Sequence, residues 1–381
     1  MHSTRIHKVI NQIISFVRFI GLGHGEDRHT LTQLRLKSIY CIYYLLFPIS
    51  FLIGAITKET VDESIFLAEI FLVGTVMTIK IWMILWKQQQ LMRLLNRICV
   101  FSIRNDEEFS FFNVKVERFI KFVIVFACAT IVGGLGAATF PFIANKKVLI
   151  LNIAFPLDYK HSRIGFALAY IFFVTEMVLS FLGMAFSVIV WYLLLHCSLR
   201  YKILGMKIRN MGRATGGDSN VKILGKEQQI FQQELVASIE SYLHLRGLID
   251  ELESFLSKLF LLQFATSALC ICASIYCLAF DVSVNFVERG IHVYTLFYHT
   301  AELFMITYLG NEIMLSSSWL KYSLFESEFV GQPHSTKRCI LVFGEYLKQP
   351  HEMLIGKLYP LTLETFTRVR VIVGCKLVRC V

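Results

Sequence analysis

Long apolar runs without charge are the feature that most constrains this chain. Three of them, at residues 38–57, 122–145 and 259–280, reach the roughly 20 residues that an α-helix needs to cross a bilayer. The composition agrees, because 55% of the 381 residues are hydrophobic and only 17% are charged, which is too apolar for a soluble globular protein of this size. The sequence therefore predicts an all-α membrane protein.

Three further runs carry a few polar groups and are interpreted as spans with a polar face. They are residues 64–86 with Glu69 and Lys80, residues 164–199 with Glu176, and residues 290–313 with His292, His299, Glu302 and Glu312. A weaker seventh run extends from Leu358 to the C-terminus and is interrupted by Glu364, Arg368, Arg370, Lys376 and Arg379.

The distribution of Lys and Arg predicts the orientation of these spans. Basic residues concentrate before the first span and in the second, fourth and sixth loops, which places those segments in the cytoplasm by the positive-inside rule. The N-terminus is then cytoplasmic and, with seven spans, the C-terminus is extracellular. Residues 9–23 resemble an amphipathic helix at the membrane surface rather than a cleaved signal. Residues 211–221 have loop composition.

Charged groups inside the spans have two interpretations. Each can be satisfied inside the bundle, or Glu69, Glu176 and His299 or Glu302 can surround a water-accessible cavity. Glu69 and Lys80 lie about 16 Å apart along one helix and are not expected to pair. His299 and Glu302 are two potential metal ligands without a third, so no metal site is predicted.

Several function classes are disfavoured. The net charge of +10 would suggest nucleic acid in a soluble protein, but here it follows from the basic loops and predicts no nucleic-acid binding. Zinc-protease, serine-hydrolase and phosphate-loop motifs do not occur; Gly356-Lys357 lacks the rest of a phosphate-binding loop. We expect neither an enzyme nor a cofactor.

The C-terminal third carries a series of short motifs in a fixed order. They closely resemble the signature of the insect odorant receptor family. The motifs are Gly310-Asn311-Glu312-Ile313, Ser316, Leu320, Lys337-Arg338, Gln349-Pro350, Gly356-Lys357 and the PLTLETF sequence of residues 360–366.

This resemblance implies a ligand-gated, non-selective cation channel subunit that forms a heterotetramer with a shared co-receptor. It also implies a place in the plasma membrane of olfactory neuron dendrites and a small, volatile, hydrophobic ligand. The second, third, fourth and sixth spans are expected to enclose that ligand. Mapped onto this chain, the pocket residues are Phe66, Glu69, Ile70, Val73, Thr139, Phe140, Phe173, Met177, Tyr294 and Tyr298.

The resemblance also divides the chain. Residues 1–37 form the cytoplasmic N-terminal segment, residues 38–335 the first six spans with the pocket and cytoplasmic helix extensions, and residues 336–381 an anchor helix with an atypical seventh helix. The anchor helix is expected at residues 336–347, with Lys337, Arg338, Leu341 and Tyr346 at the subunit contact. The pore helix is expected to include Pro360, Leu363, Glu364 and Phe366.

After Phe366 the chain leaves the family pattern. On a helix Arg368, Lys376 and Arg379 fall on one face, and rings of cations would oppose cation flux. A non-conducting or truncated isoform is therefore one alternative, and a secondary transporter of a small hydrophobic solute is another, although no internal repeat supports it. The predicted orientation disfavours a G-protein-coupled receptor.

Overall fold

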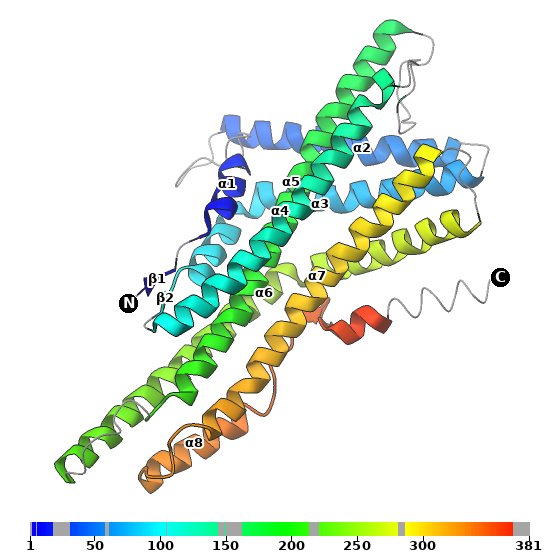
Figure 1. The fold of residues 1–381 in the computed structure, drawn as a ribbon. Helices are drawn as coiled ribbons and strands as arrows, with labels where there is room; N and C mark the ends of the chain where they lie inside the picture. The colour runs from blue at the N-terminus through cyan, green and yellow to red at the C-terminus, as the bar shows by residue number, and fades with distance from the viewer. Residues whose placement is uncertain are drawn as a thin grey trace.

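A computed structural model describes residues 2–4, 6–17, 31–57, 61–103, 105–143, 149, 162–212, 221–280 and 286–368. Eight helices of ten or more residues, a short helical segment at residues 363–368 and four very short strands occur in these ranges (Figure 1). The elements are β1 (His2–Ser3), α1 (Lys8–Val17), α2 (Leu31–Thr57), α3 (Val61–Cys99), β2 (Ser102–Ile103), α4 (Asp106–Ile143), α5 (Arg163–Arg209), α6 (Val221–Ala279), α7 (Phe286–Phe325), α8 (His334–Tyr346), β3 (Leu354–Ile355) and β4 (Tyr359–Pro360).

The long helices form one bundle in which α5 packs mainly on α7, and α2 packs mainly on α3 (Figure 1). Within the described residues, five helices, α2 to α6, are long and apolar enough to cross a membrane. Helix α7 contains 40 residues, and three of its titratable groups, His292, His299 and Glu302, are buried in the bundle. The polar groups predicted for this segment therefore face the interior of the bundle.

Several helices continue well beyond a membrane thickness, in agreement with the expected helix extensions. Helix α5 has 47 residues and α6 has 59, which at 1.5 Å per residue correspond to about 70 and 90 Å. The side chain of Ser162 caps α5 by accepting a hydrogen bond from the Gly165 amide at 3.2 Å. Of the predicted loop at residues 211–221, positions 213–220 lie outside the described residues.

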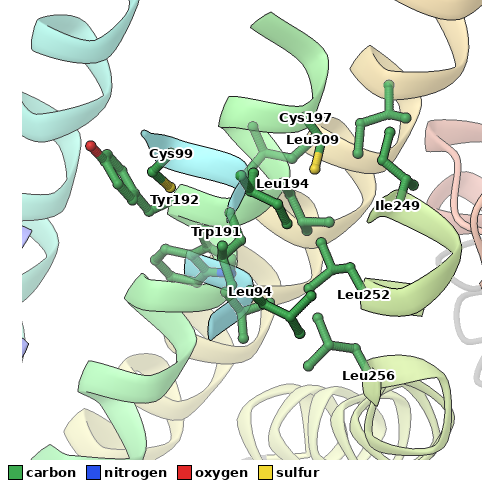
Figure 2. Packing of buried hydrophobic residues seen from close by; sticks show 14 of the residues in the cluster. Leu94, Cys99, Trp191, Tyr192, Leu194, Cys197, Ile249, Leu252, Leu256 and Leu309 are labelled. Atoms are coloured by element: carbon green, nitrogen blue, oxygen red, sulfur yellow. The ribbon is translucent and has the colours of Figure 1, made fainter. Parts of the chain in front are cut away.

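The main core lies where α3, α5, α6 and α7 meet. Leu94 of α3, Trp191 and Leu194 of α5, and Leu252 of α6 pack together there and are fully or nearly fully buried (Figure 2). Helix α1 adds Ile10 and Ile14 to the same cluster. Of the amphipathic helix predicted at residues 9–23, the part up to Val17 is present as α1, and residues 18–23 lie outside the described residues. We expected its apolar face at the membrane surface, but Ile10 and Ile14 pack against protein.

The hairpin formed by β3 and β4 was not predicted. Gly356 and Lys357 make its turn with φ of 58° and 62°, the left-handed region that glycine adopts easily. The Gly356 amide donates to the Ser257 carbonyl of α6 at 3.0 Å, and Gly310 of α7 lies so close to Leu361 that an added Cβ would be 2.6 Å from its Cγ. The hairpin is thereby held against both α6 and α7.

This hairpin corrects the start of the last span. We expected a helix from Leu358, but Leu358 lies in the turn region and Tyr359–Pro360 forms β4. Proline cannot donate to a helical ladder, and helix begins only at residue 363 and is described as far as residue 368. Residues 369–381, which contain most of the atypical tail, lie outside the described residues. The predicted helix at 336–347 is present as α8, with its ends shifted by two residues and one residue.

Candidate functional site

A cavity of about 450 Å³ lies among α3, α4, α5 and α7, next to α2. Its walls are mostly apolar, which suits a small hydrophobic molecule. The lining residues are Phe47, Ile70, Val73, Gly74, Met77, Thr130, Gly133, Gly134, Gly136, Ala137, Phe173, Met177, Ser180, Phe181, Met184, Gly290, Ile291, Tyr294, Thr295, Tyr298 and His299.

Two glycines of α4 shape this cavity. An added Cβ would be 3.2 Å from the Tyr294 ring at Gly133 and 3.0 Å from the Phe181 ring at Gly134. Aromatic side chains of α7 and α5 therefore reach the backbone of α4 beside an open space.

The predicted pocket residues fall into two groups. Six of them line the cavity: Ile70, Val73, Phe173, Met177, Tyr294 and Tyr298. The other four do not, because the predicted helix faces were offset from the wall. Thr139 is exposed and its hydroxyl donates to the Leu135 carbonyl of the same helix, and Phe140 is half-buried. The Phe66 ring packs on the His292 ring at a centroid distance of 5.2 Å, beside Glu69.

Glu69 belongs to a separate buried polar site between α3, α6 and α7. Ser274 donates to Glu69 Oε1 at 2.5 Å, and His292 Nδ1 lies 3.2 Å from Glu69 Oε2. Glu176 is fully buried, and its carboxylate oxygens have no hydrogen-bond partner within the described part of the chain. Neither acid lines the cavity, so the hypothesis of a single cavity surrounded by these carboxylates is wrong.

Lys80 and Glu302 form a buried ion pair below the cavity. Ser187 donates to Glu302 Oε1 and Gln263 donates to Glu302 Oε2, each at 2.8 Å. The remaining space around this pair is about 10 Å³, too little for more than one water molecule. The sequence analysis missed Ser187 and Gln263 because it considered only acidic, basic and His side chains in the apolar runs; the amide of Gln263 was the available signal, since a buried amide needs a hydrogen-bond partner.

No metal centre is formed by the described residues, in which no group of three or more potential ligands occurs. Glu302 is already engaged by Lys80, Ser187 and Gln263. The His299 and Glu302 pair therefore stays without the further ligands that a metal needs.

The predicted anchor residues lie on α8. Arg338, Leu341 and Tyr346 are exposed and Lys337 is half-buried, while Ile340 packs into the core on the opposite face. Among the predicted pore residues, Pro360 is in β4, and Leu363, Glu364 and Phe366 lie in the turn of helix that follows. The Phe366 ring contacts Phe304 of α7 at a centroid distance of 6.0 Å.

Comparison with known proteins decides the family. A model of the 7tm odorant receptor family matches residues 60–370, most of the chain and all four helices around the cavity. This chain belongs to the 7tm odorant receptor family. It is therefore a membrane protein, and its family consists of receptors rather than enzymes.

Individual members of the odorant receptor family are distant in sequence. Odorant receptor 23a of Drosophila melanogaster is 25% identical over 252 residues, 65% of this chain and 60% of that protein. Odorant receptor 94a of the same species is 22% identical over 299 residues, 76% of this chain and 72% of that protein. Odorant receptor 10 of Aedes albopictus is 23% identical over 35% of each chain. The chain thus spans about 60% of the length of the first of these relatives.

Solved structures show that the odorant receptor fold extends over the whole chain. The olfactory receptor OR5 of Machilis hrabei aligns with a TM-score of 0.81 and 15% identity, covering 98% of this chain and 97% of that one. The structure of the same receptor in complex with eugenol aligns with a TM-score of 0.79 and 16% identity, covering 97% and 96%. The seven-span plan of the family accounts for the helices described above.

Proposed function

We propose that this chain is the ligand-binding subunit of an odorant-gated, non-selective cation channel, and that the cavity among α3, α4, α5 and α7 is its odorant site. The single observation that supports this most strongly is the 450 Å³ apolar cavity in a chain of the odorant receptor family. The OR5 receptor of Machilis hrabei has been solved in complex with eugenol, a small aromatic molecule. The volume and aromatic lining here suit a ligand of similar size.

The proposed assembly is a heterotetramer with a shared co-receptor in the plasma membrane of olfactory neuron dendrites. The exposed face of α8, with Arg338, Leu341 and Tyr346, supports a role in subunit contact, because a mixed apolar and basic patch on a short amphipathic helix suits a protein interface. The proposed orientation keeps the N-terminus and α8 in the cytoplasm, and the C-terminus outside.

The test is co-expression of this chain with a co-receptor subunit and exposure to a broad panel of volatile compounds. We expect inward cation currents that depend on both subunits and on the compound. Currents that are identical with the co-receptor alone would contradict the proposal. A second test uses the Met177→Trp variant, whose larger side chain fills the cavity. We expect it to lose the response to odorants while it is still expressed at the cell surface.

The basic residues that follow Phe366 support a second candidate function, in which this chain binds ligand but conducts poorly. Arg368 and Arg370 follow the last predicted pore residue closely, and Lys376 and Arg379 come later. A subunit with these charges along a pore is expected to bind ligand and conduct poorly. Ligand binding to the purified chain, without current in cells that display it at the surface, would favour this alternative.

A further inference from the structure

Two polar atoms among the residues that line the cavity have no hydrogen-bond partner within the described chain. They are Tyr298 Oη and His299 Nε2, on side chains that are 7% and 2% exposed as whole residues. Two other lining hydroxyls are satisfied, since Thr130 donates to the Phe126 carbonyl at 2.7 Å and Ser180 to the Glu176 carbonyl at 3.0 Å. A buried polar atom without a partner costs free energy, so a partner from the cavity would stabilise both.

A chain of hydrogen bonds determines which kind of partner His299 needs. It begins at Glu302, whose carboxylate pairs with Lys80 and can only accept. Gln263 Nε2 donates to Glu302 Oε2 at 2.8 Å and to Ser267 Oγ at 3.0 Å. The carboxylate thereby fixes the orientation of the Gln263 amide, and the oxygen of Ser267 becomes an acceptor.

The next link in this chain is the contact between Ser267 Oγ and His299 Nδ1 at 3.1 Å. A hydroxyl oxygen can accept twice, so the bond from Gln263 does not by itself set the direction of this contact. Within the described residues, however, Nδ1 is the one acceptor in hydrogen-bond reach of the Ser267 hydroxyl, so its proton is directed to Nδ1. The neutral imidazole then carries its proton on Nε2. His299 therefore offers an N–H donor at the wall of the cavity.

We propose that His299 is a specificity-determining residue, which donates from Nε2 to an acceptor oxygen of the ligand. The ligand class is then a small, mostly apolar molecule with a carbonyl, ester or ether oxygen. The adjacent Tyr298 ring, with its centroid 5.4 Å from that of His299, adds a second group that can accept or donate. This inference rests on the proposed function, because it requires that the cavity binds ligand.

Matched pairs of probes test the inference. Acetophenone and α-methylstyrene have nearly the same shape but differ in C=O against C=CH₂, as do 2-heptanone and 2-methyl-1-heptene. Binding to the purified full chain and, where it conducts, current with the co-receptor are measured for each. We expect the ketone of a pair that binds to be preferred by about 5- to 10-fold, the effect of one buried hydrogen bond.

Four variants isolate the donor. His299→Phe keeps an aromatic ring without the N–H, and should bring the preference for the ketone to about 1 while binding of the alkene is retained. His299→Gln keeps an N–H donor and should restore part of the preference. Ser267→Ala frees the proton to move to Nδ1 and should lower the preference without changing the cavity wall. Phe297→Leu, at an exposed position of α7 outside the cavity, should leave it unchanged.

The possible outcomes separate the inference from the proposed function. Two results would overturn the role of His299 without contradicting the odorant site: equal affinity of the wild-type chain for ketone and alkene, or an equal change of the two affinities in His299→Phe. Loss of the preference in His299→Phe and a lower preference in Ser267→Ala, with no change in Phe297→Leu, would support the inference. If neither these pairs nor a broad set of volatile carbonyls, esters, ethers and hydrocarbons binds, the proposed function fails, and the inference fails with it.

Discussion

The two ends of the bundle are packed very differently. At the cavity end, where α3, α4, α5 and α7 surround the 450 Å³ space, the wall is shared between the edge of the large core cluster, with Met77 and Tyr298, and a small separate cluster around Phe47, Phe51 and Phe173. At the hairpin end, where β3 and β4 contact α6 and α7, the large core cluster extends into Ile355 and Leu361, and the space of about 330 Å³ nearby, among α4, α5 and α7, has polar and basic residues in its wall. The difference indicates that the cavity end has room for a small apolar molecule, whereas packing fixes the shape of the hairpin end.

The boundary between the two ends is the Lys80–Glu302 pair, and it gives the largest expected effect. Lys80→Met leaves the Glu302 carboxylate buried without a counter-charge, which costs about 3–5 kcal/mol. We expect a large loss of thermal stability of the purified receptor. The double variant Lys80→Met with Glu302→Gln should recover most of it, since no buried charge remains. A change below about 1 kcal/mol in Lys80→Met would show that the two ends unfold independently of this pair.

Glycine substitutions sharpen the contrast more directly. Gly310→Ala places a Cβ against Leu361 at the hairpin end, and such overpacking costs about 1–3 kcal/mol. Gly136→Ala, at the cavity end, meets nothing within 4 Å and is the matched control, with an expected change near zero. Equal destabilisation of the two variants, measured by thermal unfolding, would contradict the difference in packing.

Filling the cavity should affect binding more than stability. Val73→Phe adds volume to a wall that has open space beside it, so we expect roughly a tenfold loss of affinity for the larger ligands, about 1.4 kcal/mol, and a smaller loss for the smallest ones. Dose–response curves over a homologous ligand series measure this. A uniform loss across the series would indicate that the side chain acts on gating rather than on the shape of the site.

The smallest effect concerns pH at the hairpin end. His351 is 6% exposed and lies between Tyr201 Oη at 2.8 Å and Asp250 Oδ1 at 3.0 Å. Burial lowers its pKa below the usual value; Asp250 opposes that shift and Arg246 adds to it. The unfolded chain then binds the proton more tightly, so the stabilisation is complete above about pH 6.5 and is lost as the pH falls through the lowered pKa.

We therefore expect a modest loss of thermal stability between pH 7.5 and 5.5 that is reduced in His351→Gln. The exposed side chain of His244, on the same helix as Asp250, provides the control variant His244→Gln, which should keep the wild-type slope. An identical slope in His351→Gln would assign the pH dependence to other groups.

The sequence predicted the helices well because a bilayer requires about 20 apolar residues for each span, and it predicted the family through residues 310–366. It could not predict partners across the bundle. As predicted, Glu69 and Lys80 do not pair with each other. Their actual partners, His292 and Glu302, depend on the rotation of α7 relative to α3 and could not be predicted. The same uncertainty in helix rotation explains why Thr139 and Phe140 were expected in the cavity and lie outside it.

The turn at Gly356 and Lys357 was missed for a different reason. Its sequence was recognised only as part of a motif, whereas the positive φ angles depend on docking of the hairpin against α6. An isolated glycine between short apolar segments was the available signal for a turn. Apolar content alone favoured a longer last helix, and Pro360 was the residue that argued against it.

Helix α7 passes through every part of the receptor described above. Tyr298 and His299 are at the cavity, Glu302 is at the ion pair, and Gly310 is at the hairpin, all on one helix without a break. From Tyr298 to Gly310 the distance along the axis is about 18 Å. Such a rod can tilt or rotate but hardly shortens. Under the proposed function, we expect a ligand that displaces Tyr298 to shift Gly310 as well, and with it Leu361, which packs against Gly310.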